Sequence, residues 1–185
     1  MAQITTFVAV DAGPELNVKA YGAVGDGVTD DLAAIQAAHT ALAATGGTIY
    51  FPPGLYMITG SGRYVTITKS NVKLVCDPAA WIISENSDDP ETHLAPKYIG
   101  FTISGNYCTV NINLRGGLCS WAPSGVTHEL LLENCIFKNL HNVALTVSST
   151  AFARLTVKSC LFDTSLDTDV GNYTVIQRNS PSTDP

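Results

Sequence analysis

The sequence predicts an all-β protein, wound as a short parallel β-helix and preceded by one capping helix. The first observation is an internal repeat: residues 130–137 (LLLENCIF) and 155–162 (LTVKSCLF) match at a constant offset of 25 residues. A fixed period of this length is typical of a solenoid, in which short units stack on one another. The second observation is that apolar residues alternate within each unit, as they do in strands. The third is that only one segment, about 30–44, has a helical pattern.

The N-terminal part of the chain is expected to close one end of the coil stack. Residues 1–16 are predicted to be an irregular leader, and residues 17–47 a cap that holds a short strand, a glycine-dense turn and the helix. A β-helix that begins at Thr48 exposes the edge of its first coil. Because exposed strand edges invite uncontrolled pairing, the helix just before that coil is suited to cover it.

Acidic residues of this cap are expected to have structural roles. Asp26 lies between two glycines, where its carboxylate is predicted to bond to turn amides rather than to hold a metal or a phosphate. Asp30 and Asp31 lie where the helix begins, so helix capping is favoured over acid–base catalysis. Gly46 and Gly47 are predicted to stop the helix.

Residues 48–178 are expected to form about four to five coils. Short apolar segments between turn residues supply the strands at 48–51, 55–58, 64–67, 72–75, 81–83, 100–103 and 109–114, followed by the two repeat copies. Residues 172–175 match residues 142–145, so about five residues are inserted around 166–171. Solenoids tend to place binding surface in one-sided insertions of this kind. Residues 179–185 are expected to be a disordered tail.

Composition excludes several classes of partner. The net charge is −6 and no Lys/Arg cluster occurs, so nucleic acid is not an expected partner. No apolar run approaches the about 20 residues of a membrane span, and the first residues do not resemble a secretory signal, so we expect cytoplasmic synthesis. The five cysteines contain no CxxC pair, so no metal site is expected. Cys135 and Cys160 are expected to stack in the core rather than to form a disulfide.

The segments 17–31 (NVKAYGAVGDGVTDD) and 48–56 (TIYFPPGLY), with the helix between them, resemble the N-terminal signature of the pectate-lyase-3-like, pectin-lyase-fold superfamily. This group includes bacteriophage tailspikes, capsule depolymerases and polygalacturonase-type hydrolases. The resemblance implies a right-handed parallel β-helix. In phage members it also implies a homotrimer and a carbohydrate ligand. The Asn-Thr-Asp, His-Gly and Arg-x-Lys motifs of the polygalacturonase type are absent from residues 48–178.

Candidate catalytic residues are carboxylates, because glycoside cleavage and lyase chemistry need a base or a pair of acids. The best cluster consists of Asp163, Asp167 and Asp169, on and beside the inserted segment. A purely structural role for this cluster is kept as an alternative. A second acidic cluster at residues 85–91 is interpreted as a solvated loop.

Candidate substrate-binding residues are Trp121, Tyr173 and Glu133. Aromatic rings can stack on sugars, although packing at the coil edge is an alternative for Trp121 and Tyr173. Glu133 lies one coil before the acidic cluster and matches Lys158 in the repeat, so a surface ion pair between coils is its alternative. No cofactor is expected.

Three functions are compatible with these features. The first is a virion protein of the tailspike type that assembles as a homotrimer or with other virion subunits and binds bacterial surface polysaccharide. The second is a polysaccharide lyase or glycoside hydrolase that uses the Asp163 cluster. The third is a structural virion component without a ligand. The missing hydrolase motifs favour the first function over the second.

Overall fold

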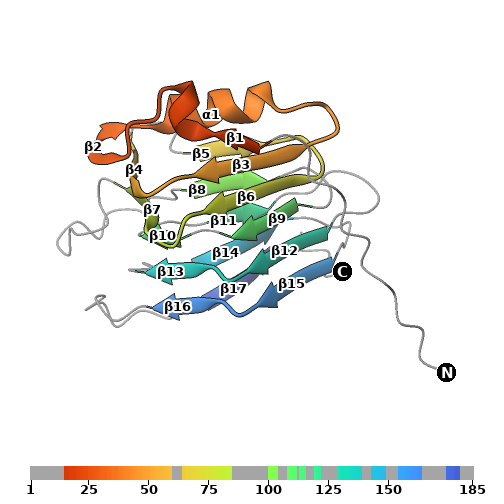
Figure 1. Cartoon of the computed structure of the whole chain (residues 1–185). Coiled ribbons are helices and arrows are strands. Elements are labelled where there is room, and N and C mark those ends of the chain that lie inside the picture. Colours follow the sequence, from red (N-terminus) through yellow and green to blue (C-terminus); the bar gives the residue numbers. More distant parts are fainter. Residues whose placement is uncertain are drawn as a thin grey trace, which may run out of the picture.

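The computed structural model describes residues 15–59, 64–84, 100–103, 108–111, 113–115, 119–121, 129–138, 143–148, 154–163 and 174–179. The described strands form three parallel sheets (Figure 1). The first sheet contains β1 (Glu15–Asn17), β3 (Gly47–Phe51), β6 (Val72–Cys76), β9 (Cys108–Asn111), β12 (Glu129–Glu133) and β15 (Arg154–Lys158). The second contains β2 (Asp26–Asp30), β4 (Gly54–Ile58), β7 (Ala80–Ser84), β10 (Asn113–Arg115), β13 (Ile136–Lys138) and β16 (Leu161–Asp163). The third contains β5 (Tyr64–Ile67), β8 (Gly100–Ile103), β11 (Cys119–Trp121), β14 (Val143–Ser148) and β17 (Thr174–Asn179).

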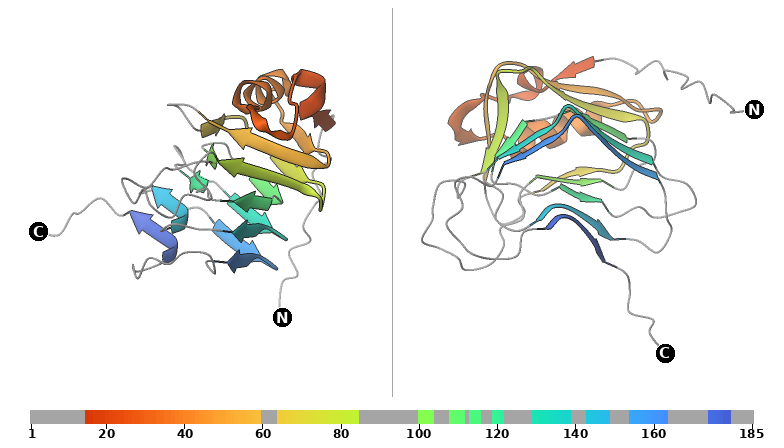
Figure 2. Two further views of the ribbon diagram at one scale, coloured as in Figure 1. Left: turned by 90° about the vertical axis from the view of Figure 1, so that its left-hand side faces the viewer. Right: turned by 90° about the horizontal axis from the view of Figure 1, so that it is seen from below.

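The chain visits the three sheets in turn, so each coil contributes one strand to each sheet. From β3 onward the described strands make five such coils, which we number 1 to 5, and β1 and β2 extend the first two sheets beyond coil 1. The two views of Figure 2 show the stack of coils from the side and along its axis. The predicted parallel β-helix of about four to five coils with an N-terminal capping helix is therefore confirmed.

The register between coils 4 and 5 follows the sequence repeat. Leu130 pairs with Leu155, Leu132 with Val157 and Phe137 with Phe162, each at the offset seen in the sequence. The rings of Phe137 and Phe162 stack with centroids 5.0 Å apart and an interplanar angle of 5°. Because side chains alternate along a strand, these residues face the interior and the intervening ones face outward.

Cys135 and Cys160 occupy the same turn of adjacent coils, as the repeat predicted. The N–H of Leu161 donates to the carbonyl of Cys135 at 2.9 Å, which ties the two turns together. The thiol of Cys135 lies 3.0 Å from the carbonyl oxygen of Val110, and the thiol of Cys160 lies 3.5 Å from that of Leu132. Each cysteine thus donates to the preceding coil, and neither is in a disulfide.

Helix α1 (Leu32–Ala41) takes the place of a strand beside β5. The Gln36 amide pairs with Thr66 of β5 as a strand would: its oxygen accepts the Thr66 N–H at 2.8 Å and its nitrogen donates to the Thr66 carbonyl at 3.1 Å. Nε2 of the buried His39 accepts the N–H of Thr68 at 3.2 Å. Side chains of α1 therefore satisfy backbone groups at the edge of the first coil, which is the capping role that the sequence predicted.

The cap differs locally from the sequence prediction. The helix is shorter than the predicted 30–44, because Leu42 is extended and Lys69 Nζ donates to the carbonyls of Thr40 at 2.7 Å and Leu42 at 2.5 Å. The short strand predicted at the start of the cap is β1 followed by a 3₁₀ helix, η1 (Val18–Tyr21), whose first turn is capped by the Asn17 side chain. Residues 1–14 and 180–185 lie outside the described residues.

Candidate functional site

The acidic residues of the cap are engaged by backbone amides. One carboxylate oxygen of Asp26 accepts the N–H groups of Val28 at 2.8 Å and Thr29 at 2.7 Å, and the other accepts the Thr29 hydroxyl at 2.9 Å. These hydrogen bonds lower the pKa of Asp26. The geometry confirms the predicted turn-stabilising contacts of Asp26.

Asp31 departs from the predicted capping role. Its carboxylate reaches back and accepts the N–H groups of Val24 at 2.7 Å and Gly25 at 3.1 Å, and it makes no side-chain hydrogen bond to the helix. Asp30 instead accepts the N–H of Leu32 at 3.1 Å. Burial raises the pKa of Asp31, and the two amide hydrogen bonds oppose that rise. Asp31 therefore holds the glycine-rich turn against the helix, so it is a structural residue.

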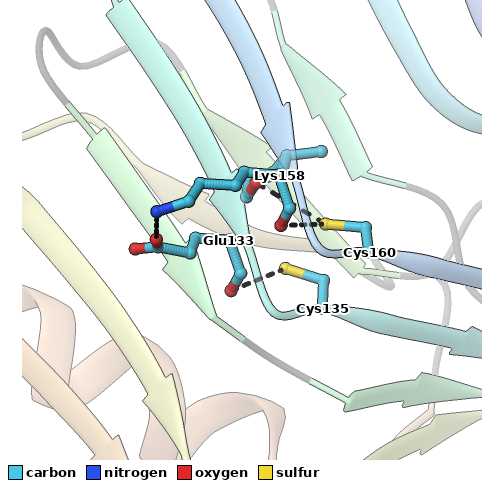
Figure 3. A network of polar contacts seen from close by, with 5 residues as sticks. Glu133, Cys135, Lys158 and Cys160 are labelled. Atoms are coloured by element: carbon cyan, nitrogen blue, oxygen red, sulfur yellow. Dashed lines mark hydrogen bonds and ion pairs between the residues drawn. The ribbon is translucent and has the colours of Figure 1, made fainter.

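Glu133 lies on the outer face of the first sheet, where Lys158 of the next coil lies beside it. Lys158 Nζ and Glu133 Oε1 are 2.6 Å apart (Figure 3). Four residues earlier, Arg154 and Glu129 form a looser pair at 3.9 Å. The predicted ion pair between coils is confirmed. A role of Glu133 in substrate binding stays a prediction.

The structure places Asp163 at the end of β16, in register with Lys138 of β13. Lys138 is in turn in register with Arg115 of β10. Lys138 and Asp163 directly follow Phe137 and Phe162, which pack in the core, in their strands. We call Arg115, Lys138 and Asp163 the charged column. It places one candidate acidic residue in register with two basic residues on successive strands.

The two basic members of the charged column were not predicted from the sequence. Lys138 precedes Asp163 by the same 25 residues that separate Cys135 from Cys160. Extending the repeat alignment by one residue beyond Phe137 and Phe162 identifies this pair. Arg115 has a different offset and is assigned only by the register of β10 and β13.

The other predicted site residues are only partly described. Trp121 ends β11, in register with Ile103 and Val147, and its side chain is not among those described. Asp167, Asp169 and Tyr173 lie outside the described residues, as does the acidic segment 85–91. Within the described residues, no three His, Cys, Asp or Glu side chains gather where they could hold a metal ion. None of the helices in this part of the chain has the length and apolar character to cross a membrane.

Several known proteins are similar to part of this chain. Mannuronan C5-epimerase AlgE2 of Azotobacter vinelandii is 54% identical over 66 residues, which are 33% of this chain and 6% of the epimerase. Alginate lyase 7 of the same organism is 51% identical over 65 residues, or 33% of this chain and 8% of the lyase. The plasmin and fibronectin-binding protein A of Streptococcus pneumoniae is 42% identical over 71 residues, or 37% of this chain and 9% of that protein.

The solved structure of that last protein, the surface adhesin PfbA, matches with a TM-score of 0.55 at 24% sequence identity. The match covers 80% of this chain and 38% of the adhesin chain. At this identity the likeness shows the fold alone. This chain spans less than a tenth of the length of the three curated relatives. The model of the rhamnogalacturonase A/epimerase, pectate lyase-like family matches residues 16–183, and the chain therefore belongs to that family.

Proposed function

We propose that this chain is a β-helical module that binds an anionic bacterial surface polysaccharide, within a virion protein of the tailspike type. The observation that carries the proposal is the diversity of its relatives. An epimerase, a lyase and an adhesin each share about a third of this chain at 42–54% identity. Proteins with different activities share a scaffold more readily than a catalytic centre. The shared part therefore supports a binding or scaffolding role.

The charged column supports an anionic ligand. Arg115 and Lys138 occupy neighbouring positions on adjacent strands of the second sheet. Strands lie about 4.8 Å apart, which is close to the length of one sugar residue, so a sugar chain running along the stack would advance by about one residue per coil. Guanidinium and ammonium groups pair with carboxylates through charge-assisted hydrogen bonds. A uronate or sialate polymer is therefore a better fit than a neutral glucan.

Binding can be tested with the full chain and purified polysaccharides. Alginate, polygalacturonate and a set of acidic capsules are compared with neutral dextran by calorimetry. We expect saturable binding to at least one acidic polymer, weakened about tenfold or more in Arg115→Gln/Lys138→Gln. Lys73→Gln is the matched control, because Lys73 lies on the outer face of the first sheet in coil 2. Equal binding by both variants would contradict a role for the column, and binding to none of the polymers would contradict the ligand class.

A second function, cleavage or epimerisation of an acidic polysaccharide, is favoured by the place of Asp163. Removing the C5 proton of a uronate needs a base, and a cation next to it stabilises the enolate that forms. The register puts Asp163 beside Lys138, so the charged column contains both kinds of group. Asp163 would take the C5 proton, and Lys138 and Arg115 would neutralise the sugar carboxylate. In cleavage the enolate would then expel the sugar linked through O4, whose oxygen takes a proton from water, and in epimerisation C5 would take a proton from water on the opposite face.

The two functions are separated by product analysis. A lyase releases unsaturated uronate, which absorbs in the ultraviolet, and an epimerase changes the ratio of the two uronates seen by proton NMR. Activity that disappears in Asp163→Asn while polysaccharide binding persists would establish the enzyme. Binding without product, for wild type and variant alike, would establish the binding module.

The assembly state and the location form part of the same proposal. A tailspike-type module is expected to act as a homotrimer or with other virion subunits, after synthesis in the cytoplasm. Sedimentation equilibrium of the full chain measures this directly, and a trimer is the expected result. A monomer at all concentrations, together with a gene neighbourhood of sugar-uptake genes rather than virion genes, would favour the enzyme.

A further inference from the structure

His39 lies in helix α1, against the edge of coil 1, and N–H donors face both of its ring nitrogens. The residue is 4% exposed. Its Nε2 lies 3.2 Å from the backbone nitrogen of Thr68, just beyond β5, and 3.5 Å from that of Lys69. Its Nδ1 lies 3.2 Å from the side-chain nitrogen of Gln36, one turn earlier in the helix. The buried ring therefore contacts a donor on each side.

The orientation of the Gln36 amide is fixed by Thr66. The amide oxygen accepts the Thr66 N–H and the amide nitrogen donates to the Thr66 carbonyl, so the NH₂ group is the one that faces His39. An amide NH₂ group donates and does not accept, and a neutral imidazole has one accepting nitrogen. The neutral ring can therefore accept one of the two contacts. A protonated ring has no accepting nitrogen and can accept neither.

The charges around the ring also disfavour its protonated form. The Lys69 ammonium donates to two carbonyls at the C-terminal end of α1, so it already occupies the negative end of the helix dipole. Burial, and then this ammonium, lower the pKa of His39. The 3₁₀ helix η1, which also packs against α1, carries Lys19 and Tyr21. Asp31, at the start of α1, is engaged by the amides of the glycine-rich turn.

We propose that His39 is an acid-sensitive latch between the cap and the coils: protonation of its ring opens the contact between α1 and residues 66–69. The imidazolium would face two donors and an ammonium, and Thr68 would lose its acceptor. Opening lets water solvate the ring and these amides, so a proton favours the open form. The strands of coils 2 to 5 pair with one another and not with α1, so they stay folded when the cap opens.

Amide hydrogen exchange of the full chain, followed by mass spectrometry, tests the latch. Protection factors, which correct for the intrinsic exchange rate at each pH, are compared for residues 64–69 and for residues 129–138 of coil 4. Opening takes up one proton, so we expect the protection of residues 64–69 to fall by up to about tenfold per pH unit below about 6.5. The protection of residues 129–138 is expected to stay constant.

Two variants identify the group that takes up the proton. His39→Gln places a side chain that does not titrate at the same helix position, and we expect it to abolish the fall in protection. His128→Gln removes a histidine outside the cap and is expected to behave like wild type. Constant protection of residues 64–69 in the wild-type chain overturns the proposal. The same fall in His39→Gln, or a parallel fall in residues 129–138, overturns it as well.

If His39→Gln does not fold, NMR titration of the histidine rings in the wild-type chain decides. The latch requires the pKa of His39 in the folded chain to lie below its pKa in the urea-unfolded chain, because the closed form must bind the proton more weakly than the open form. An equal or higher pKa in the folded chain overturns the proposal.

Discussion

At the first coil, the edge of β5 pairs with side chains of α1, whereas at the fifth coil the edges of β15 and β16 have no partner among the described strands. The exposed fraction of the residue at the equivalent inward position differs between the inner coils and coil 5. Residues of the inner coils, such as Leu74, Val110 and Leu132, are at most 1% exposed, while Val157 is 38% exposed. A parallel β-helix has no closed surface at its ends, so each end needs a cover. The difference shows that side chains of α1 cover the edge of coil 1, while no described strand covers the described strands of coil 5.

The largest expected effect compares the two stacked phenylalanines. Phe137 is fully buried between coils, whereas Phe162 is partly exposed on the last one. We expect Phe137→Ala to lower the free energy of unfolding by about 3–5 kcal/mol, and Phe162→Ala by roughly half as much, because a cavity forms only where atoms surround the ring on all sides. Urea denaturation of both variants measures the difference. Equal losses would mean that coil 5 is covered in solution.

Gly46 tests the junction between the cap and coil 1. Its φ is 97°, and a Cβ there would lie 2.3 Å from the carbonyl oxygens of Ser70 and Asn71. We expect Gly46→Ala to lower the free energy of unfolding by about 3 kcal/mol, because alanine is strained at this φ and its Cβ would clash with the two carbonyl oxygens. Gly22→Ala is the matched control: its φ is 100°, but nothing lies within 4 Å, so about 1 kcal/mol of backbone strain is expected. Similar losses in the two variants would contradict the steric explanation.

Gln36 tests how the cap satisfies the edge of β5. Replacing it with alanine removes both hydrogen bonds to Thr66, and we expect a loss of about 1–2 kcal/mol with faster aggregation on heating. Ala37→Gln is the control: it keeps Gln36 and adds a second amide at an exposed position one residue along the helix. Light scattering during a thermal ramp measures the aggregation. If the control aggregates as readily as Gln36→Ala, the amide does not protect the edge.

These contrasts also show how far the sequence could predict the molecule. The repeat predicted the pairing of Leu130, Phe137 and Cys135 with their counterparts, because alignment at a fixed period is the same information as register in a parallel stack. The contacts of Asp31 and Gln36 were not predicted. Asp31 contacts amides of the preceding glycine-rich turn, and Gln36 contacts a strand 30 residues later in the chain. Local sequence propensity does not predict contacts of either kind. Arg115 was missed because its coil has a different length from the next one.

A smaller effect is expected from the titration of His39, which lies in the cap helix α1. Burial, and then the nearby Lys69 ammonium, lower the pKa of His39. Between that lowered pKa and the ordinary value of about 6.5, the unfolded chain binds a proton that the folded chain does not, so stability rises with pH across this range. We expect stability to fall as the pH drops below about 6.5, and this slope to be reduced in His39→Gln. Urea midpoints at several pH values measure it, and an unchanged slope would assign the titration to other groups.

The smallest expected effect concerns the ion pair between coils 4 and 5. Glu133 and Lys158 are close, but their side chains are 31% and 66% exposed, so water screens the attraction. A double-mutant cycle with Glu133→Gln and Lys158→Met should give a coupling energy of about 0.3–1 kcal/mol, decreasing with salt. A coupling energy that stays the same between low and high salt would contradict this screening by water.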